Sequence, residues 1–138
     1  MAYPFKPLQT ALYQRLSNDS ELKKIITGIY DHVEVDIPFP YIIIGEPRIP
    51  TQEIVKFNNI YNCTVTLHTW FNQQTANRYG NTATYEILDA VHEALKIRLD
   101  VVGYKNVNAY MDSPKVLDDI DNILKHGILN YHITLQEI

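Results

Sequence analysis

Two segments of the chain alternate strictly between two kinds of side chain, which is the period of a β-strand with one buried face. In residues 61–71 the apolar face carries Tyr61, Cys63, Val65, Leu67 and Phe71. In residues 129–136 it carries Leu129, Tyr131, Ile133 and Leu135. We therefore predict two antiparallel strands that each pack one face on a core and turn the other toward water or a partner.

Three other segments carry the period of an α-helix. Residues 7–16 predict a short amphipathic helix, and residues 18–26 predict a second one with Asn18 as its N-cap and Gly28 as its end. Residues 82–99 predict a long helix with one apolar and one charged face. The apolar stripe of this long helix consists of Ile87, Leu88, Val91, Leu95 and Leu99.

The remaining elements complete an α+β pattern. Residues 107–111 predict a further strand, and residues 116–127 predict a hairpin turn with Asp121 and Asn122 near its tip. The run Tyr41–Ile44 does not alternate, which favours a strand that is central or buried on both faces. We expect residues 1–138 to form one domain, in which a mostly antiparallel sheet packs against one long helix and short N-terminal helices.

Charge and cysteine content narrow the possible functions. Twelve Lys and Arg against sixteen Asp and Glu give a net charge of −4, without the basic stripe that binds nucleic-acid phosphates. One cysteine permits neither an internal disulfide nor a thiolate cluster. The first ten residues do not resemble a signal peptide, and no stretch approaches the roughly 18 apolar residues of a membrane span. These features predict a soluble protein of a reducing compartment.

No motif in the chain predicts catalysis, and no cofactor is expected. Pro47 follows Gly45 and Glu46 directly, so a helix cannot begin there with its N–H groups directed at a phosphate. Cys63 lies on the apolar face of its strand, where a buried, unactivated thiol is expected. His68 and His132 both fall on polar faces and could meet across the sheet, but spacing supplies no third ligand for a metal.

Five segments together resemble one protein family. They are "ALYQRL" (11–16), "FPYIIIGEP" (39–47), "VTLHTWF" (65–71), "EILDAVHEAL" (86–95) and "HGILNYHITL" (126–135). In this order and spacing the chain resembles the tail-completion, or tail-terminator, proteins of long-tailed bacteriophages and prophages. The resemblance spans nearly the whole chain, and its motifs are structural signatures rather than catalytic ones.

The resemblance implies a function in virion assembly. Such proteins gather as a ring, typically hexameric, on the end of the finished tail tube, stop the polymerisation of the tube protein and offer a surface to the head connector. The implied partners are the tail tube protein, the head connector and further copies of this chain, while genomic DNA passes the lumen without specific binding. The implied location is the head–tail joint of a virion assembled in the host cytoplasm.

The candidate partner-binding residues lie in the loops 48–59 and 72–82 and in the acidic turn 118–122, which differ most from the family pattern. They are Arg48, Gln52, Lys56, Asn58, Gln73, Arg78, Tyr79, Asp118, Asp119 and Asp121. Three alternatives stay open: ordinary solvated loops, a host cytosolic interaction module unrelated to phage, or a small α+β ligand-binding or enzymatic domain that uses His68 and His132 in one pocket.

Overall fold

The computed structural model describes residues 3–33, 36–50, 54–55 and 59–138. The chain forms four helices and six strands in this part, in the order α1 (Phe5–Ser17), α2 (Ser20–Ile25), β1 (Gly28–Tyr30), β2 (Tyr41–Ile44), β3 (Ile54–Val55), β4 (Ile60–Asn72), α3 (Gln73–Ala76), α4 (Thr82–Lys96), β5 (Tyr104–Asp118) and β6 (Leu124–Glu137). The strands form one sheet in the order β1-β2-β4-β6-β5, and the short β3 pairs with β4. The predicted α+β class is confirmed.

The sheet is mostly antiparallel, as predicted, and its centre consists of the long strands β4 and β6. They pair over their whole length, from Ile60 opposite Gln136 to Asn72 opposite Leu124. One edge of the sheet departs from the antiparallel pattern, because β1 pairs with β2 in parallel. Strand β1 has only three residues, too few for a period to be recognised in the sequence.

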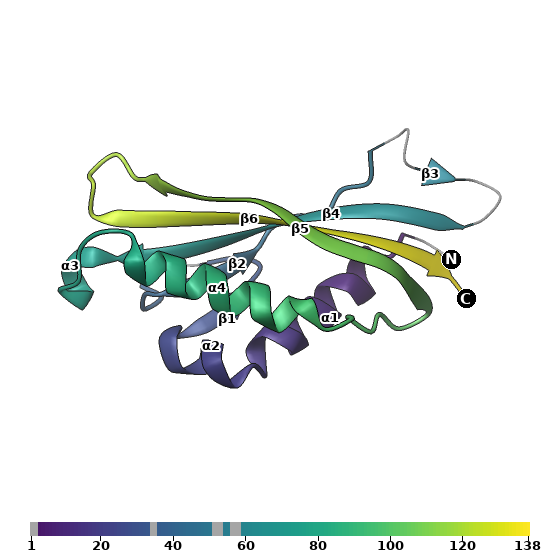
Figure 1. The fold of residues 1–138 in the computed structure, drawn as a ribbon, viewed down its shortest axis with the longest axis horizontal. Helices are drawn as coiled ribbons and strands as arrows, with labels where there is room; N and C mark the ends of the chain where they lie inside the picture. Colours follow the sequence, from purple (N-terminus) through teal and green to yellow (C-terminus); the bar gives the residue numbers. More distant parts are fainter. Residues whose placement is uncertain (1–2, 34–35, 51–53, 56–58) are drawn as a thin grey trace.

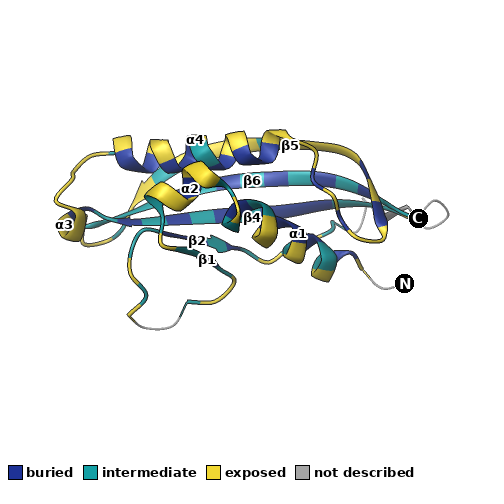
Figure 2. Cartoon of the chain, turned by 90° about the horizontal axis from the view of Figure 1, so that it is seen from below, coloured by how far each residue is buried: buried dark blue, intermediate teal, exposed yellow. Residues whose placement is uncertain are grey.

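The helices cover one face of the sheet and leave the other face open (Figure 1). The buried sides of α1 and α4 point toward the sheet, and their exposed sides point away from it (Figure 2). The predicted apolar faces of β4 and β6 supply much of the core between the layers, together with Leu8, Leu12 and Leu16 of α1. The alternation of both strands is therefore confirmed.

Helix α4 approaches β6 closely at Gly127. A methyl group there would lie 2.9 Å from Cγ2 of Thr84 and 3.4 Å from Cδ2 of Leu88, and would overlap the side-chain hydroxyl of Thr69. Because the glycine carries no side chain, the helix layer and two strands meet at van der Waals distance. This glycine belongs to the signature segment 126–135, so close packing explains the glycine in that signature.

Strand β2 lies inside the sheet, between β1 and β4, as the run of four apolar residues predicts. Tyr41, Ile42 and Ile44 are buried, and Ile43 is half-buried. Gly45 follows the strand, and its N–H donates to the carbonyl of Thr66 at 2.8 Å. The segment 41–45 is therefore a core strand and the glycine that follows it, and it contributes no catalytic group.

Two predicted helix boundaries are wrong by a few residues. Asp19, not Asn18, caps α2, because its carboxylate accepts a hydrogen bond from the N–H of Leu22 at 3.0 Å. The long helix ends at Lys96, where Ile97 takes up an extended conformation. Leu99 is buried in the core, but it lies beyond the helix. Among the described residues, no helix has the length and apolar character needed to span a membrane.

Candidate partner-binding surfaces

The turn between β5 and β6 carries the acidic residues singled out in the sequence. Asp118 forms an ion pair with Lys125 across the hairpin. The carboxylates of Asp119 and Asp121 accept hydrogen bonds from the N–H groups of Ile120 (2.8 Å) and Ile123 (3.0 Å). Each carboxylate therefore shapes the turn; Asp121 is exposed to solvent, and Asp119 is half-buried. The predicted hairpin, with its tip near Asp121, is confirmed.

Gln73 holds this turn in place from the first residue of α3. Its side-chain Nε2 donates to the carbonyls of Asn122 (2.9 Å) and Ile123 (3.1 Å). Its Oε1 accepts a hydrogen bond from the N–H of Gly80 at 2.9 Å. The side chain is only 4% exposed, so the expectation that Gln73 offers itself to a partner is wrong. Gln73 instead joins the acidic turn to the loop after α3, and composition alone cannot distinguish a buried glutamine from an exposed one.

Arg78 and Tyr79 lie in the loop that Gln73 holds, so the structure brings them to the same end of the molecule as the acidic turn. Arg78 donates two hydrogen bonds to the Glu86 carboxylate, at 2.8 and 2.9 Å. These bonds lower the pKa of Glu86 and raise that of Arg78. Tyr79 is 68% exposed, which leaves a large amphipathic ring available for an interface.

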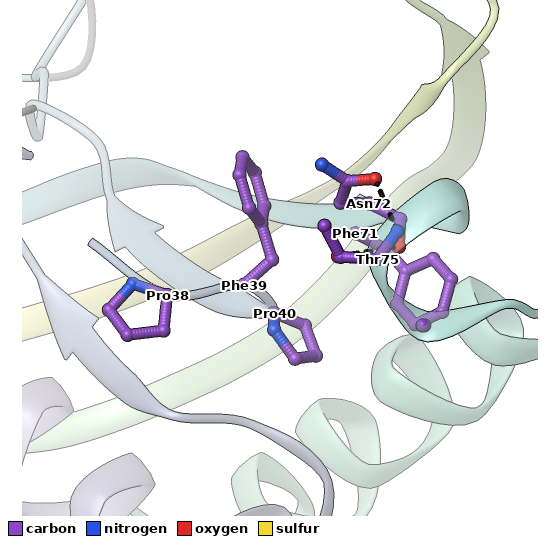
Figure 3. A pocket seen from close by; sticks show the side chains of 7 residues that line it. Pro38, Phe39, Pro40, Phe71, Asn72 and Thr75 are labelled. Atoms are coloured by element: carbon purple, nitrogen blue, oxygen red, sulfur yellow. Dashed lines mark hydrogen bonds between the residues drawn. The ribbon is translucent and has the colours of Figure 1, made fainter. Parts of the chain in front are cut away.

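A hollow of about 360 Å³ lies beside α3 (Figure 3). Its walls come from the segment before β2 and from the junction of β4 and α3, namely Pro38, Phe39, Pro40, Phe71, Asn72, Thr75 and Ala76. The Asn72 carboxamide accepts hydrogen bonds from the N–H groups of Gln74 and Thr75 and thereby begins α3. The sequence pattern did not indicate this hollow, because its walls come from segments thirty residues apart.

Arg48 lies apart from that end of the molecule. Its N–H and carbonyl both pair with Thr64 on β4, at 2.9 Å each. Thr64 precedes Asn72, the end of β4, by eight residues, which corresponds to roughly 26 Å along a strand. Arg48 is exposed and borders a hollow of about 420 Å³ on the open sheet face. Gln52, Lys56 and Asn58 lie outside the described residues.

The open face of β4 and β6 consists of polar cross-strand pairs that bond to each other. Thr134 donates to Asn62 at 2.6 Å, and Thr66 donates to Asn130 at 2.9 Å. Thr64 and His132 share a hydrogen bond of 3.0 Å. Neighbouring side chains on this face therefore satisfy one another's hydrogen-bonding groups across the two strands.

His68 and His132 do not meet, so the expectation that they share a pocket is wrong. His68 lies opposite Ile128 and His132 opposite Thr64, an offset of four residues or roughly 13 Å. His68 Nδ1 instead shares a hydrogen bond of 2.8 Å with His126 Nε2, and Trp70 stacks on His126 at 4.0 Å. Burial lowers the pKa of both histidines, and the proximity of His68 lowers that of His126 further.

His132 is held by a second set of neighbours. Its Nε2 and the Asp112 carboxylate share a hydrogen bond of 2.9 Å, and Tyr110 stacks on its ring at 4.6 Å. Thr64 is buried, and burial raises the pKa of the adjacent Cys63 to about 12, so the Cys63 thiol is not an activated nucleophile. Within the part of the chain that the structure describes, no three His, Cys, Asp or Glu side chains gather as metal ligands.

Comparison with known proteins identifies the family. Residues 10–136 match the family described as "Tail completion protein gp17". The chain is 27% identical over 135 residues to the "Tail completion protein gp17" of Bacillus phage SPP1, with 94% of this chain and 92% of that protein covered.

A solved structure shares the fold. A chain of the structure described as "Virion of native gene transfer agent (GTA) particle" superposes with a TM-score of 0.81 at 18% identity. The likeness covers 98% of this chain and 99% of that one, which extends the shared fold over the sheet and all its helices. Because the family model matches residues 10–136, the chain belongs to the family of Tail completion protein gp17 and is a structural protein of bacteriophage tail assembly.

Proposed function

We propose that this protein completes the phage tail by binding the end of the finished tail tube, stopping its polymerisation and forming the tail-side interface for the head connector. The observation that carries this proposal is the family match over residues 10–136. The shape of the molecule supports it, because the helices cover one face of the sheet and leave the other face open to partners. The whole chain, residues 1–138, would act as one tail-completion domain.

A ring of identical copies, six in our proposal, is the form in which the protein would act. Each copy of such a ring needs two different patches, because head-to-tail contacts are heterologous. The sheet has two different edges, β1 and β5, and it is therefore suited to such contacts. The net charge of −4 would let genomic DNA pass the lumen without binding to its wall.

The surfaces that we assign to partners are the hairpin end and the Arg48 side of the open face. Arg78, Tyr79, Asp118, Asp119 and Asp121 belong to the first surface, and Gln73 positions them. Arg48 belongs to the second; Gln52, Lys56 and Asn58 stay a prediction from the sequence. Because the two surfaces lie at different places along β4, one copy can contact two different neighbours at once.

Electron microscopy of particles from a phage that lacks this gene tests the proposal. We expect abnormally long tails, tails without heads and full heads without tails, because tube growth would continue and the connector would find no docking surface. Expression of the intact chain from a plasmid should restore tail length and joining. Normal-length tails joined to heads in the deletion strain would contradict the proposal.

A further inference from the structure

A groove runs along the outer edge of β1, beside α1 and α2. It consists of two adjoining hollows of about 630 and 370 Å³, which share Tyr13, Ile29 and Tyr30 in their walls. Ile29 is 6% exposed and forms an apolar floor, whereas Tyr13 is 50% exposed and forms part of the rim. Because β1 ends the sheet on this side, the groove borders an edge strand without a further neighbour among the described residues.

The groove carries more positive than negative charge at its rim. Lys6 borders the larger hollow and Lys23 the smaller one, and neither lysine forms an ion pair with any described residue. Asp31 also borders the larger hollow, where its carboxylate accepts a hydrogen bond from Gln9 at 2.8 Å. An apolar floor between two free cations fits a partner that presents an apolar side chain flanked by carboxylates.

The tip of the β5–β6 hairpin has this chemistry. Ile120 is 100% exposed and Leu117 is 45% exposed. Asp119 and Asp121 flank Ile120, and neither forms an ion pair within the described residues, in contrast to Asp118. A single exposed isoleucine is ordinary on a protein surface. This one is held on a turn whose conformation the buried Gln73 fixes, so little conformational entropy remains to be lost on binding.

The hairpin and the groove of one molecule cannot meet. The hairpin joins β6 to the edge strand β5, and the groove follows the opposite edge strand β1 (Figure 1). Two complementary patches on opposite edges of one subunit make a heterologous contact, which generates a closed ring when the rotation between copies closes. A second copy of this chain is therefore the occupant that fits both patches.

We propose that the hairpin tip of one copy binds in the β1–α1 groove of the next, with Ile120 on the apolar floor and Asp119 and Asp121 near Lys23 and Lys6. This contact rests on the proposed ring and names the two surfaces that build it. It assigns a role to α1, α2 and β1 that neither the sequence motifs nor the family match assigns.

Cross-linking with engineered cysteines tests the contact. The pair Ile120→Cys and Tyr13→Cys would place one thiol at the tip and one at the groove, and a short bismaleimide would join neighbouring copies. The native Cys63 is buried and its pKa is raised to about 12, so it contributes little background. The matched control combines Ile120→Cys with Tyr85→Cys, because Tyr85 on α4 is 51% exposed, close to the 50% of Tyr13, but lies outside the groove.

The reaction is carried out on purified virions and on concentrated purified protein. We expect a ladder of covalent multimers that ends at the ring size for the groove pair, and only monomers for the control pair. Monomers alone from the groove pair, or a cross-link from Ile120→Cys to another virion protein, would overturn the contact. If virions lack the chain, the proposed function fails, while the purified protein still decides whether the tip binds the groove.

Charge removal provides an independent test. The changes Asp119→Asn and Asp121→Asn keep the oxygen atoms that accept the turn hydrogen bonds but remove both charges. Combined with the cysteine pair, they should lower the cross-linking yield at low salt at least several-fold, as should Lys6→Gln with Lys23→Gln. The two Asp changes and the two Lys changes combined should lower the yield no further than either pair alone, because both pairs remove the same charge contacts. Equal cross-linking yields in all variants, or additive losses of yield, would contradict the pairing. The matched charge control is Asp89→Asn with Asp100→Asn.

Discussion

Gln73 provides the sharpest test of how the hairpin end is built. Replacement by Met keeps most of the side-chain volume but removes the hydrogen bonds to Asn122, Ile123 and Gly80, which measure 2.9, 3.1 and 2.9 Å. Each such bond contributes about 0.5–1.5 kcal/mol net. Asn122 and Gly80 are exposed, so water can replace part of this contribution. We expect a loss of about 2 kcal/mol for Gln73→Met, within the usual range for a broken buried polar contact.

Thermal unfolding and hydrogen exchange measure this effect. For a chain of 138 residues, a loss of about 2 kcal/mol corresponds to a fall in Tm of roughly 6–10 °C. The Gly80 amide should exchange faster in the variant, because its acceptor is gone. Gln73→Ala should cost more, since it also leaves a cavity. An unchanged Tm together with unchanged exchange at Gly80 in Gln73→Met would refute the positioning role of this side chain.

Three further predictions concern the core and the sheet face. Gly127→Ala should cost about 1–3 kcal/mol by overpacking against Thr84, measured by urea unfolding; an unchanged midpoint would contradict the close approach of α4. Because folding lowers the pKa values of His68 and His126, the unfolded chain takes up protons more readily than the folded chain does. The contribution of this pair to the free energy of unfolding is therefore complete above pH 6.5 and is lost as pH falls below it. Replacement of both by Gln should therefore reduce the drop in Tm between pH 7.5 and pH 5, and an unaltered drop would contradict this. Cys63, with its pKa raised to about 12, should react with a thiol reagent only in denaturant, and rapid reaction of the native protein would show that it is accessible.

The sequence predicts those elements whose period is long enough to be recognised. Strands β4 and β6 have 13 and 14 residues, and their alternation alone indicates the buried faces that the structure confirms. Strand β1 has three residues, so its parallel pairing with β2 is determined by tertiary packing and leaves no local signal. Strand β5 runs from Tyr104 to Asp118, whereas the sequence predicted only 107–111. The prediction was too short because two bulges interrupt the alternation of this strand.

The candidate site is harder to predict from the sequence than the fold, because it depends on contacts between distant segments. Polar composition pointed to the loop after β4 and to the acidic turn as candidates, but it did not show that Gln73 is buried and joins them. The groove beside β1 combines residues of three elements, and its free lysines stand out only when the fold brings them to one rim. His126, the true neighbour of His68, was likewise missed, because register between strands is not readable from either strand alone.

We propose that this chain closes the tail tube as a ring at the head–tail joint, and a cryo-electron microscopy map of that joint in intact virions tests this most directly. We predict density for six copies of this fold between the last tube ring and the head connector, with each β5–β6 hairpin in the groove of its neighbour. A map that contains this fold elsewhere in the particle, or a joint in which the tube contacts the connector directly, would contradict the claim.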